Sequence, residues 1–242
     1  MPYEPRTYRE QVDPAGLVGF EVVHGETDLF VAAARDLAEE ALDVVKDLRR
    51  ALDAYVVTHP WFAESLAPVP VEDDAPGIVR WMAAAAVRTG VGPMAAVAGA
   101  VAEAVARALQ PRSREVIVEN GGDVFILTET ERRVRLDAGE SPLSGRVAIV
   151  VGPAPEGVAV CTSSATVGPS LSLGSAHAAT VVASSGALAD AAASVLGNLL
   201  HDPADIAGAL ERVLAIEGVL GAVAVVGDTI GAAGAVRLDR AA

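Results

Sequence analysis

One long stretch of the chain, residues 157–189, contains no Asp, Glu, Lys or Arg over 33 residues. It is crowded with Ser, Thr and Gly, and it ends directly before Asp190. The segment has no full charges to hold it in water, and it carries too many hydroxyl groups for an ordinary core. Its polar groups must therefore hydrogen-bond internally or to a ligand. We expect this segment to form the wall of a binding site.

The composition of the 242-residue chain allows a sizeable core built from small side chains. Hydrophobic residues make up 52% of the chain and aromatic residues only 4%, so Ala, Val and Leu must fill most of the interior. The formal net charge of −14 argues against nucleic acid as a partner, because phosphate backbones are bound by clustered Lys and Arg. A small anionic ligand would need a shielded pocket of backbone N–H groups or a bound cation.

The chain has one cysteine, Cys161, and no segment typical of a secretory signal. A single cysteine excludes an intrachain disulfide and a Cys-based zinc cluster, as is usual in a reducing cytoplasm. Gly, Ser or charged residues interrupt every apolar run before about 18 residues accumulate, so we expect no membrane span. We predict a cytoplasmic protein, and the apolar composition favours a homodimer.

The hydrophobic patterns predict an α+β fold of two layers, with antiparallel sheets and buried Ala-rich helices. The two halves of the chain resemble each other, since an Ala-rich helix and a hairpin turning at Gly-Asp occur in each. We expect one domain, residues 1–242, with internal duplication over about residues 6–128 and 132–240. Strands are expected at 8–12, 17–23, 28–33, 115–119, 124–127, 134–136, 147–151, 158–161, 219–226 and 235–238, and helices at 34–52, 78–88, 93–109, 187–200 and 203–216.

Several short motifs, taken in order, resemble those of a known family. They read ETDL at 26–29, GVGPMAAVAG at 90–99, VENGGD at 118–123, AGESPLS at 138–144, CTSS at 161–164, ADAA at 189–192 and GN at 197–198. The chain is similar to the uncharacterised protein family 0280 (UPF0280), which is related to the ApbE-type FAD:protein FMN transferases. The resemblance covers roughly residues 6–238. It implies an ApbE-like fold of T-fold type, duplicated within one chain, with a ligand site between the halves.

Asp190 and Ser194 form the candidate metal site. Their i, i+4 spacing on a predicted helix places both oxygens on one side, where they can share a hard cation such as Mg²⁺. In the flavin transferases the matching block reads Ala-Asp-Ala, with a Thr four residues after the Asp, and binds magnesium; Ser194 keeps the hydroxyl. The structural alternative is that Asp190 caps its own helix and Ser194 packs as a small residue.

The glycine turn at residues 120–123 is the candidate cofactor-binding segment. Its glycines let a ligand approach the main chain, and successive N–H groups can bind an anion. The turn resembles the Asn-x-Gly-Gly-Asp block that lines the flavin-nucleotide site of the transferases, whereas Asn-Gly between apolar runs is by itself typical of a hairpin turn. A helix start near residue 92 offers free backbone N–H groups that can bind a phosphate. The alternative is that its small residues allow close packing against a sheet. The candidate cofactor-binding residues are Asn120, Gly121, Gly122, Asp123, Thr162, Ser163, Ser164 and Gly92.

Three positions in the uncharged segment depart from the family pattern: Ala165, Pro169 and His177. The resemblance implies that a His is lost and that an Asp is replaced by an imidazole, which suits Mg²⁺ poorly. His177 and Asp190 are the candidate catalytic residues, and a hydrogen-bonded structural His is the alternative for the first. Cys161 is a candidate nucleophile or persulfide carrier, but no charged neighbour in the sequence activates it, so a core thiol is the simpler interpretation.

Three functions stay open. The first is an enzyme that binds FAD, FMN or another small anionic metabolite and uses Mg²⁺ on Asp190 for transfer chemistry. The second is a non-catalytic metabolite-binding or accessory protein with an eroded site, which the three departures favour. The third is a role in sulfur metabolism through Cys161.

Overall fold

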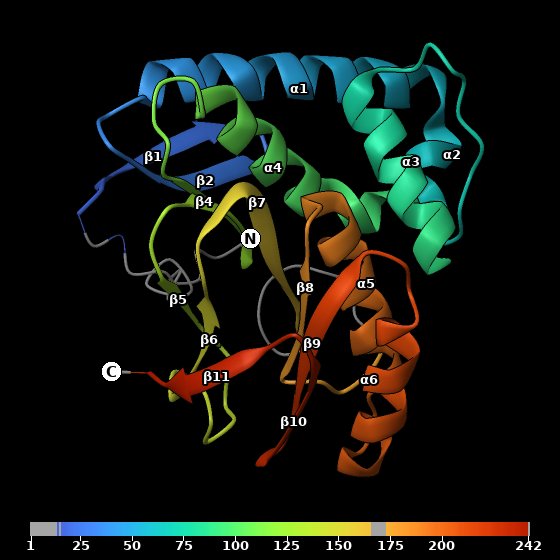
Figure 1. The fold of residues 1–242 in the computed structure, drawn as a ribbon. Helices are drawn as coiled ribbons and strands as arrows, with labels where there is room; N and C mark the ends of the chain where they lie inside the picture. The colour runs from blue at the N-terminus through green and yellow to red at the C-terminus, as the bar shows by residue number, and fades with distance from the viewer. Residues whose placement is uncertain (1–13, 15, 166–172, 242) are drawn as a thin grey trace.

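The computed structural model describes residue 14 and residues 16–165 and 173–241. The strand expected at 8–12 and Pro169 lie outside these residues. The largest element is an eight-stranded sheet in the order β1-β2-β3-β4-β7-β8-β9-β10, in which every neighbouring pair is antiparallel (Figure 1). Its strands are β1 (Val18–His24), β2 (Thr27–Ala33), β3 (Val116–Asn120), β4 (Asp123–Thr128), β7 (Ala154–Ser163), β8 (Ala178–Ala183), β9 (Val219–Val226) and β10 (Thr229–Gly234).

Helices cover one face of this sheet. The first helix packs on β1, α4 on β3 and β4, α5 on β7 and β8, and α6 on β9 and β10. The elements are α1 (Ala38–Thr58), α2 (Pro60–Glu64), α3 (Gly77–Thr89), η2 (Pro93–Ala96), α4 (Val97–Leu109), α5 (Gly186–Leu199), η3 (Pro203–Asp205) and α6 (Ile206–Leu214). The predicted helix 93–109 is thus a 3₁₀ turn followed by an α-helix.

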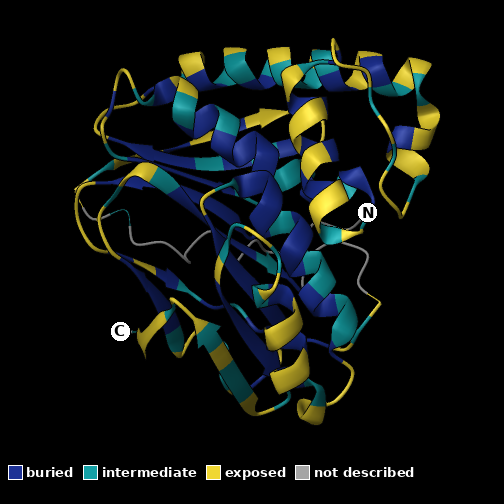
Figure 2. Cartoon of the chain, turned by 45° about the vertical axis from the view of Figure 1, so that its right-hand side comes forward, coloured by how far each residue is buried: buried dark blue, intermediate teal, exposed yellow. Residues whose placement is uncertain are grey.

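A second, three-stranded sheet packs on the opposite face. Its order is β11 (Arg237–Arg240), β6 (Val147–Val151) and β5 (Arg132–Arg135). Alternate side chains of β4 point to opposite faces of the large sheet. Phe125 and Leu127 belong to the core under the helices, whereas Val124 and Ile126 belong to the core under the small sheet. The central strands β3, β4 and β8 are buried along most or all of their length, whereas β10 and β11 are largely exposed or half-buried (Figure 2). The structure therefore has three layers, namely the helices, the large sheet and the small sheet, whereas the prediction had two.

Burial on both faces explains the uncharged segment. Its described parts form most of β7, all of β8 and the start of α5. All residues of β8 are buried, so no position is left for a charged side chain. Segments of this kind appear as continuous apolar runs without alternation.

The C-terminal hairpin differs from the prediction. The turn at Gly227 and Asp228 is correct, but β9 pairs with β10, and the strand expected at 235–238 instead forms β11 of the small sheet. The sequence of β10 is rich in Gly and Ala because its neighbours come close. A Cβ on Gly231, for example, would lie 2.4 Å from Cγ2 of Ile206 on α6.

Two runs of the order strand, strand, helices, strand, strand follow each other in the large sheet, β1 to β4 and then β7 to β10. Internal duplication and a T-fold stay predictions. Within the described residues no single helix is long and apolar enough to cross a membrane. The pair Gly77–Thr89 and Pro93–Leu109 meets the length and composition test only together, and it is bent by 105°.

Candidate functional site

The site is organised by the crossing of α4 and α5. At the crossing Gly99 and Gly186 face each other so closely that a Cβ on Gly99 would lie 2.2 Å from the carbonyl oxygen of Gly186. A Cβ on Gly186 would lie 2.1 Å from the carbonyl oxygen of Gly99. Only glycine at both positions allows this approach of the two backbones.

Each helix supplies an acid to the other at this crossing. The Gly99 N–H donates to Oδ2 of Asp190 at 2.9 Å, and the Gly186 N–H donates to Oε2 of Glu103 at 2.7 Å. Asp190 therefore satisfies the start of α4 and not the start of its own helix, whose N-cap is Ser185. The alternative in which Asp190 caps its own helix is wrong.

A cavity of about 300 Å³ opens beside Asp190. Five of its described lining residues have side chains with oxygen atoms: Ser65 after α2, Asp123 from β4, and Asp190, Ser194 and Asn198 from α5. The segment from Val91 to Ala98 supplies most of the opposing apolar wall. No Lys, Arg or His occurs among its described lining residues.

Two leucines mark the edge of this cavity. Leu66 is 70% exposed and Leu173 is 64% exposed. The N–H of Leu173 donates to Oδ1 of Asn198 at 3.0 Å, which ties this edge to α5. Apolar edges around a polar floor are typical of small-molecule sites.

The two acids of the cavity have raised pKa values. Burial raises the pKa of Asp190 from 3.8 to about 7, although the N–H groups of Gly99 and Ala98 favour the charged form. Burial, and then the charge of Asp190, raise the pKa of Asp123 well above its ordinary value, and the N–H of Thr162 opposes this at 3.1 Å. Two carboxyl groups near one another cannot both be ionised without cost, so the cavity favours a proton or a cation.

Of the predicted glycine turn, Asp123 lines the cavity, whereas Asn120, Gly121 and Gly122 do not. Asn120 donates from Nδ2 to the carbonyl oxygen of Ala98 at 3.0 Å, and the N–H of Gly122 donates to Oε1 of Glu119 at 2.8 Å. Gly121 and Gly122 have φ values of 66° and 103°, as a tight hairpin requires. The anion nest expected here therefore has one of its N–H groups already engaged.

Gly92 does line the cavity, together with Asp123, Asp190 and Ser194. A Cβ on Gly92 would lie 1.9 Å from the carbonyl oxygen of Ser65, so this glycine allows the loop after α2 to pack closely. The neighbouring start of α4 already receives the carboxylate of Asp190. Asp190 thus engages N–H groups of α4, and a phosphate site at the preceding helix start near Gly92 stays a prediction.

The predicted hydroxyl wall forms hydrogen bonds mainly within the protein. Thr162 and Thr180 share a hydrogen bond between their Oγ1 atoms at 2.9 Å, and Ser164 donates to the carbonyl oxygen of His177 at 2.8 Å. Neither Thr162, Ser163 nor Ser164 lines the cavity, and Ser163 is buried. A ligand-binding role for these three residues stays a prediction.

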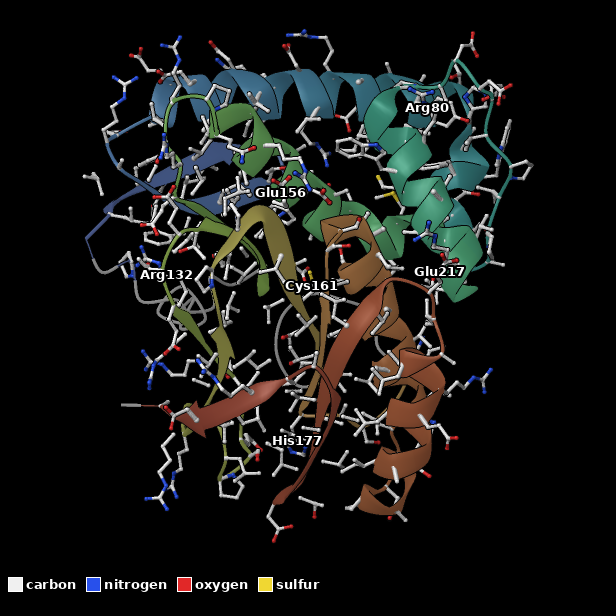
Figure 3. All side chains as sticks on the ribbon, viewed as in Figure 1. Arg80, Arg132, Glu156, Cys161, His177 and Glu217 are labelled. Carbon is white, nitrogen blue, oxygen red and sulfur yellow. The ribbon has the colours of Figure 1, made fainter. Side chains whose placement is uncertain are left out.

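Neither His177 nor Cys161, which are both labelled in Figure 3, is among the cavity's described lining residues. Nδ1 of His177 accepts a hydrogen bond from the N–H of Gly227 at 3.1 Å, which fastens the turn between β9 and β10. Cys161 is fully buried, and burial and the nearby acids Asp123 and Asp190 raise the pKa of its thiol well above 9.0. The thiol is therefore protonated at neutral pH, which disfavours a nucleophilic role.

The candidate set lacks Ser65, and it also lacks the polar lining residue Asn198. Asn198 follows Ser194 by four positions and Asp190 by eight, so a helical pattern extended by one turn would have included it. Glu103 was missed as well. It follows Gly99 by four residues, just as Asp190 follows Gly186, and this shared Gly-x-x-x-acid spacing was the available signal.

Comparisons with known proteins agree with this architecture. The family model described as AbpE bacteria matches residues 9–236. UPF0280 proteins from Methanocella arvoryzae and Methanopyrus kandleri are 40% and 42% identical to the chain; they cover 84% and 90% of it, and 83% and 91% of their own lengths are covered.

Among solved structures, the apo form of the flavinyl transferase ApbE from Pseudomonas stutzeri superposes with a TM-score of 0.53 at 12% identity. The match covers 93% of this chain and 95% of the transferase, and at this identity it shows the fold alone. The chain belongs to the AbpE bacteria family, with the UPF0280 proteins as relatives and an ApbE-like fold.

Proposed function

We propose that the cavity beside Asp190 binds a flavin nucleotide, or a small anionic metabolite of similar shape, together with a divalent cation. One observation carries this proposal: five oxygen-bearing side chains line a cavity of about 300 Å³ that contains no basic side chain among its described lining residues. The volume lies at the lower end of small-molecule sites. It suits one ring system or a mononucleotide better than a whole dinucleotide.

The charges of the cavity explain why a cation belongs to the proposal. An anionic ligand entering beside Asp123 and Asp190 meets two acids and no compensating Lys or Arg. A hard cation between the carboxylates and the ligand removes this repulsion. Carboxylate, hydroxyl and amide oxygens are the ligands that Mg²⁺ accepts. Imidazole and thiolate, which would favour other metals, do not occur among the lining residues that the structure describes.

Asp190 and Ser194 would hold the cation, with Asp123 facing the same cavity. In the described residues no group of three His, Cys, Asp or Glu side chains forms a metal cluster. The protein therefore offers too few ligands for a closed cage, as is usual for magnesium sites that also use waters and the phosphates of a substrate. When bound, the cation supplies charge neutralisation for group transfer.

The chain's own residues prepare this site. The N–H groups of Ala98 and Gly99 fix the carboxylate of Asp190. With a pKa of about 7, Asp190 releases its proton when the cation binds, so cation affinity falls as the pH drops below 7. The hydrogen bond from Leu173 to Asn198 holds the edge of the cavity over the ligand.

The fold gives independent support. The structural neighbour from Pseudomonas stutzeri is named a flavinyl transferase, and its chain aligns with nearly all of this one. Transfer of the flavin role to this chain is part of the proposal, because the sequence identity is 12%.

A second candidate function is binding without turnover. The described lining residues of the cavity include neither a His nor a Cys, since His177 holds a turn and Cys161 is buried. Only carboxyl and hydroxyl groups are left to move a proton. A metabolite-binding or accessory protein would need nothing more.

Titration calorimetry with FAD and FMN, each with and without Mg²⁺, tests these functions. The wild-type chain is compared with Asp190→Asn, which keeps the shape, and with Asp47→Asn on the exposed face of α1 as the control. Binding that requires Mg²⁺, is lost in Asp190→Asn and persists in Asp47→Asn supports the proposal. Binding independent of the metal supports the non-catalytic protein, and no binding of either flavin contradicts the flavin proposal.

A further inference from the structure

A second cavity lies at the other acid of the α4–α5 crossing. It has a volume of about 320 Å³ and is lined by Trp81 and Arg88 of α3, Glu103 of α4, and Ser185 and Leu188 at the start of α5, with two alanines of α3. It shares no lining residue with the cavity beside Asp190. The exchanged acids thus face two separate cavities, Asp190 one and Glu103 the other.

The charge of this second cavity is the reverse of the first. Glu103 is 8% exposed, and its carboxylate is satisfied by Nε of Arg107 at 2.8 Å and by the N–H of Gly186 at 2.7 Å. In the described part of the chain no carboxylate lies within ion-pair distance of Arg88. The net effect is one uncompensated guanidinium, on a chain whose net charge is −14.

Arg88 lies beside the segment that leads into β9. Its Nη1 lies 3.4 Å from the point where a Cβ on Gly218 would stand, so the guanidinium rests over the backbone that leads into β9. Gly218 has a φ of 93° and no side chain to push the arginine away. A guanidinium binds carboxylate or phosphate oxygens in pairs.

Trp81 supplies a flat apolar surface to the same cavity. It precedes Arg88 by seven residues, two turns of α3, so both side chains lie on one face of the helix. The residue is 46% exposed, which is unusual for an indole without a partner to cover it. Ser185 adds a hydroxyl, whose Oγ accepts from the N–H of Leu188 at 3.4 Å.

We infer that this cavity is a second ligand site, which binds a planar aromatic ring carrying an anionic group. The ring stacks on Trp81, the anion pairs with Arg88, and the Ser185 hydroxyl donates to a polar atom of the ligand. A mononucleotide and an aromatic carboxylate share this chemistry. The inference does not depend on what the cavity beside Asp190 binds.

The test uses the fluorescence of Trp81. The chain has only two tryptophans, so Trp61→Phe leaves Trp81 as the single indole reporter. This variant is titrated with adenosine monophosphate and with phenylacetate, and with adenosine and inorganic phosphate as halves of the ligand. Saturable quenching by the monophosphate identifies a nucleotide site, and quenching by phenylacetate identifies an aromatic carboxylate site.

Three further variants locate the binding. Arg88→Met should weaken it at least about tenfold. Arg80→Met, on the same helix but outside this cavity, and Asp190→Asn should leave it unchanged. Failure of both ligands to quench, equal quenching by adenosine and its monophosphate, or full affinity in Arg88→Met would each overturn the inference.

Discussion

At the scale of single residues, the buried acids are of two kinds. One is ionised and paired with a cation, and the others are held protonated by their raised pKa values. Glu103 is neutralised by Arg107 and a helix N–H. Among the described residues, the hydrogen-bond partners of Asp190 and Asp123 are backbone N–H groups and the Cys161 thiol, and burial raises the pKa values of both acids. Glu103 therefore has a structural role, whereas Asp190 and Asp123 are the acids that we propose bind a cation.

The raised pKa of Asp190 predicts a pH dependence of stability. Because its folded pKa of about 7 lies above its ordinary value of 3.8, the folded state holds the proton more tightly than the unfolded chain. The resulting stabilisation is full below pH 3.8 and is lost as the pH rises through 7, and Asp123 acts in the same direction. Without metal, the free energy of unfolding should fall between pH 5 and pH 8 by on the order of 3 kcal/mol.

Asp190→Asn should remove most of this decline, because the amide cannot be ionised and still accepts from Gly99. Urea unfolding at several pH values measures the effect, and Asp47→Asn provides an exposed acid for comparison. A wild-type profile that is flat across this range, or one that Asp190→Asn leaves unchanged, would refute the ionisation state assigned to Asp190.

At the scale of elements, the crossing of α4 and α5 depends on two glycines. Gly99→Ala should lower stability by about 2 to 4 kcal/mol, since its methyl group would meet the backbone of Gly186 at 2.2 Å and neither helix can shift without losing the exchanged hydrogen bonds. The same substitution at Gly208 in α6, where nothing lies within 4 Å, should be neutral or raise stability by about 0.5 to 1 kcal/mol. Thermal unfolding of the two variants provides the comparison, and equal effects would show that the crossing tolerates a Cβ.

The sequence predicted most elements but not how the layers combine. Helical spacing identified α1 and α5, and the turn signals identified the β3–β4 hairpin and the turn after β9, but not β10 as the partner of β9. The small sheet was missed because its pairing of β11 with β6 joins strands far apart in the chain, which no local pattern encodes. The hydroxyl groups of β7 and β8 were assigned to a ligand because a sequence cannot show that Thr162 and Thr180 bond to each other.

The sequence predicted the part of the candidate site that lies on a single helix, α5. Asp190 and Ser194 share a face of α5, so their spacing alone placed them together. The approach of Asp123 from β4 came from the family motif, and the role of Gly99 follows only from the tertiary contact between two helices.

At the scale of the whole molecule, one buried ion pair connects the small sheet to the large one. Nη2 of Arg132 on β5 donates to Oε2 of Glu115 at 2.7 Å, and Oε1 of Glu115 accepts hydrogen bonds from the segment after β4. These hydrogen bonds and the charge of Arg132 lower the pKa of Glu115, although burial opposes them.

Arg132→Met should lower stability by about 3 kcal/mol, since it leaves the partly buried carboxylate of Glu115 without its cation. Its neighbour Arg133 is 45% exposed at the side chain, and Arg133→Met should cost less than about 1 kcal/mol. Hydrogen exchange should increase in β5, β6 and β11 of the first variant only. Equal exchange in both variants would show that the apolar contact between the sheets suffices.

The central claim, that the cavity beside Asp190 takes an anionic ligand through a cation, is tested most directly by a crystal structure grown with FMN and Mn²⁺ as an anomalous substitute for Mg²⁺. The account predicts an anomalous peak bonded to a carboxylate oxygen of Asp190, with the phosphate of the flavin on its other side and the edge near Leu66 and Leu173 over the ring. A cavity that stays empty at saturating ligand, or a metal bound away from Asp190, would contradict it.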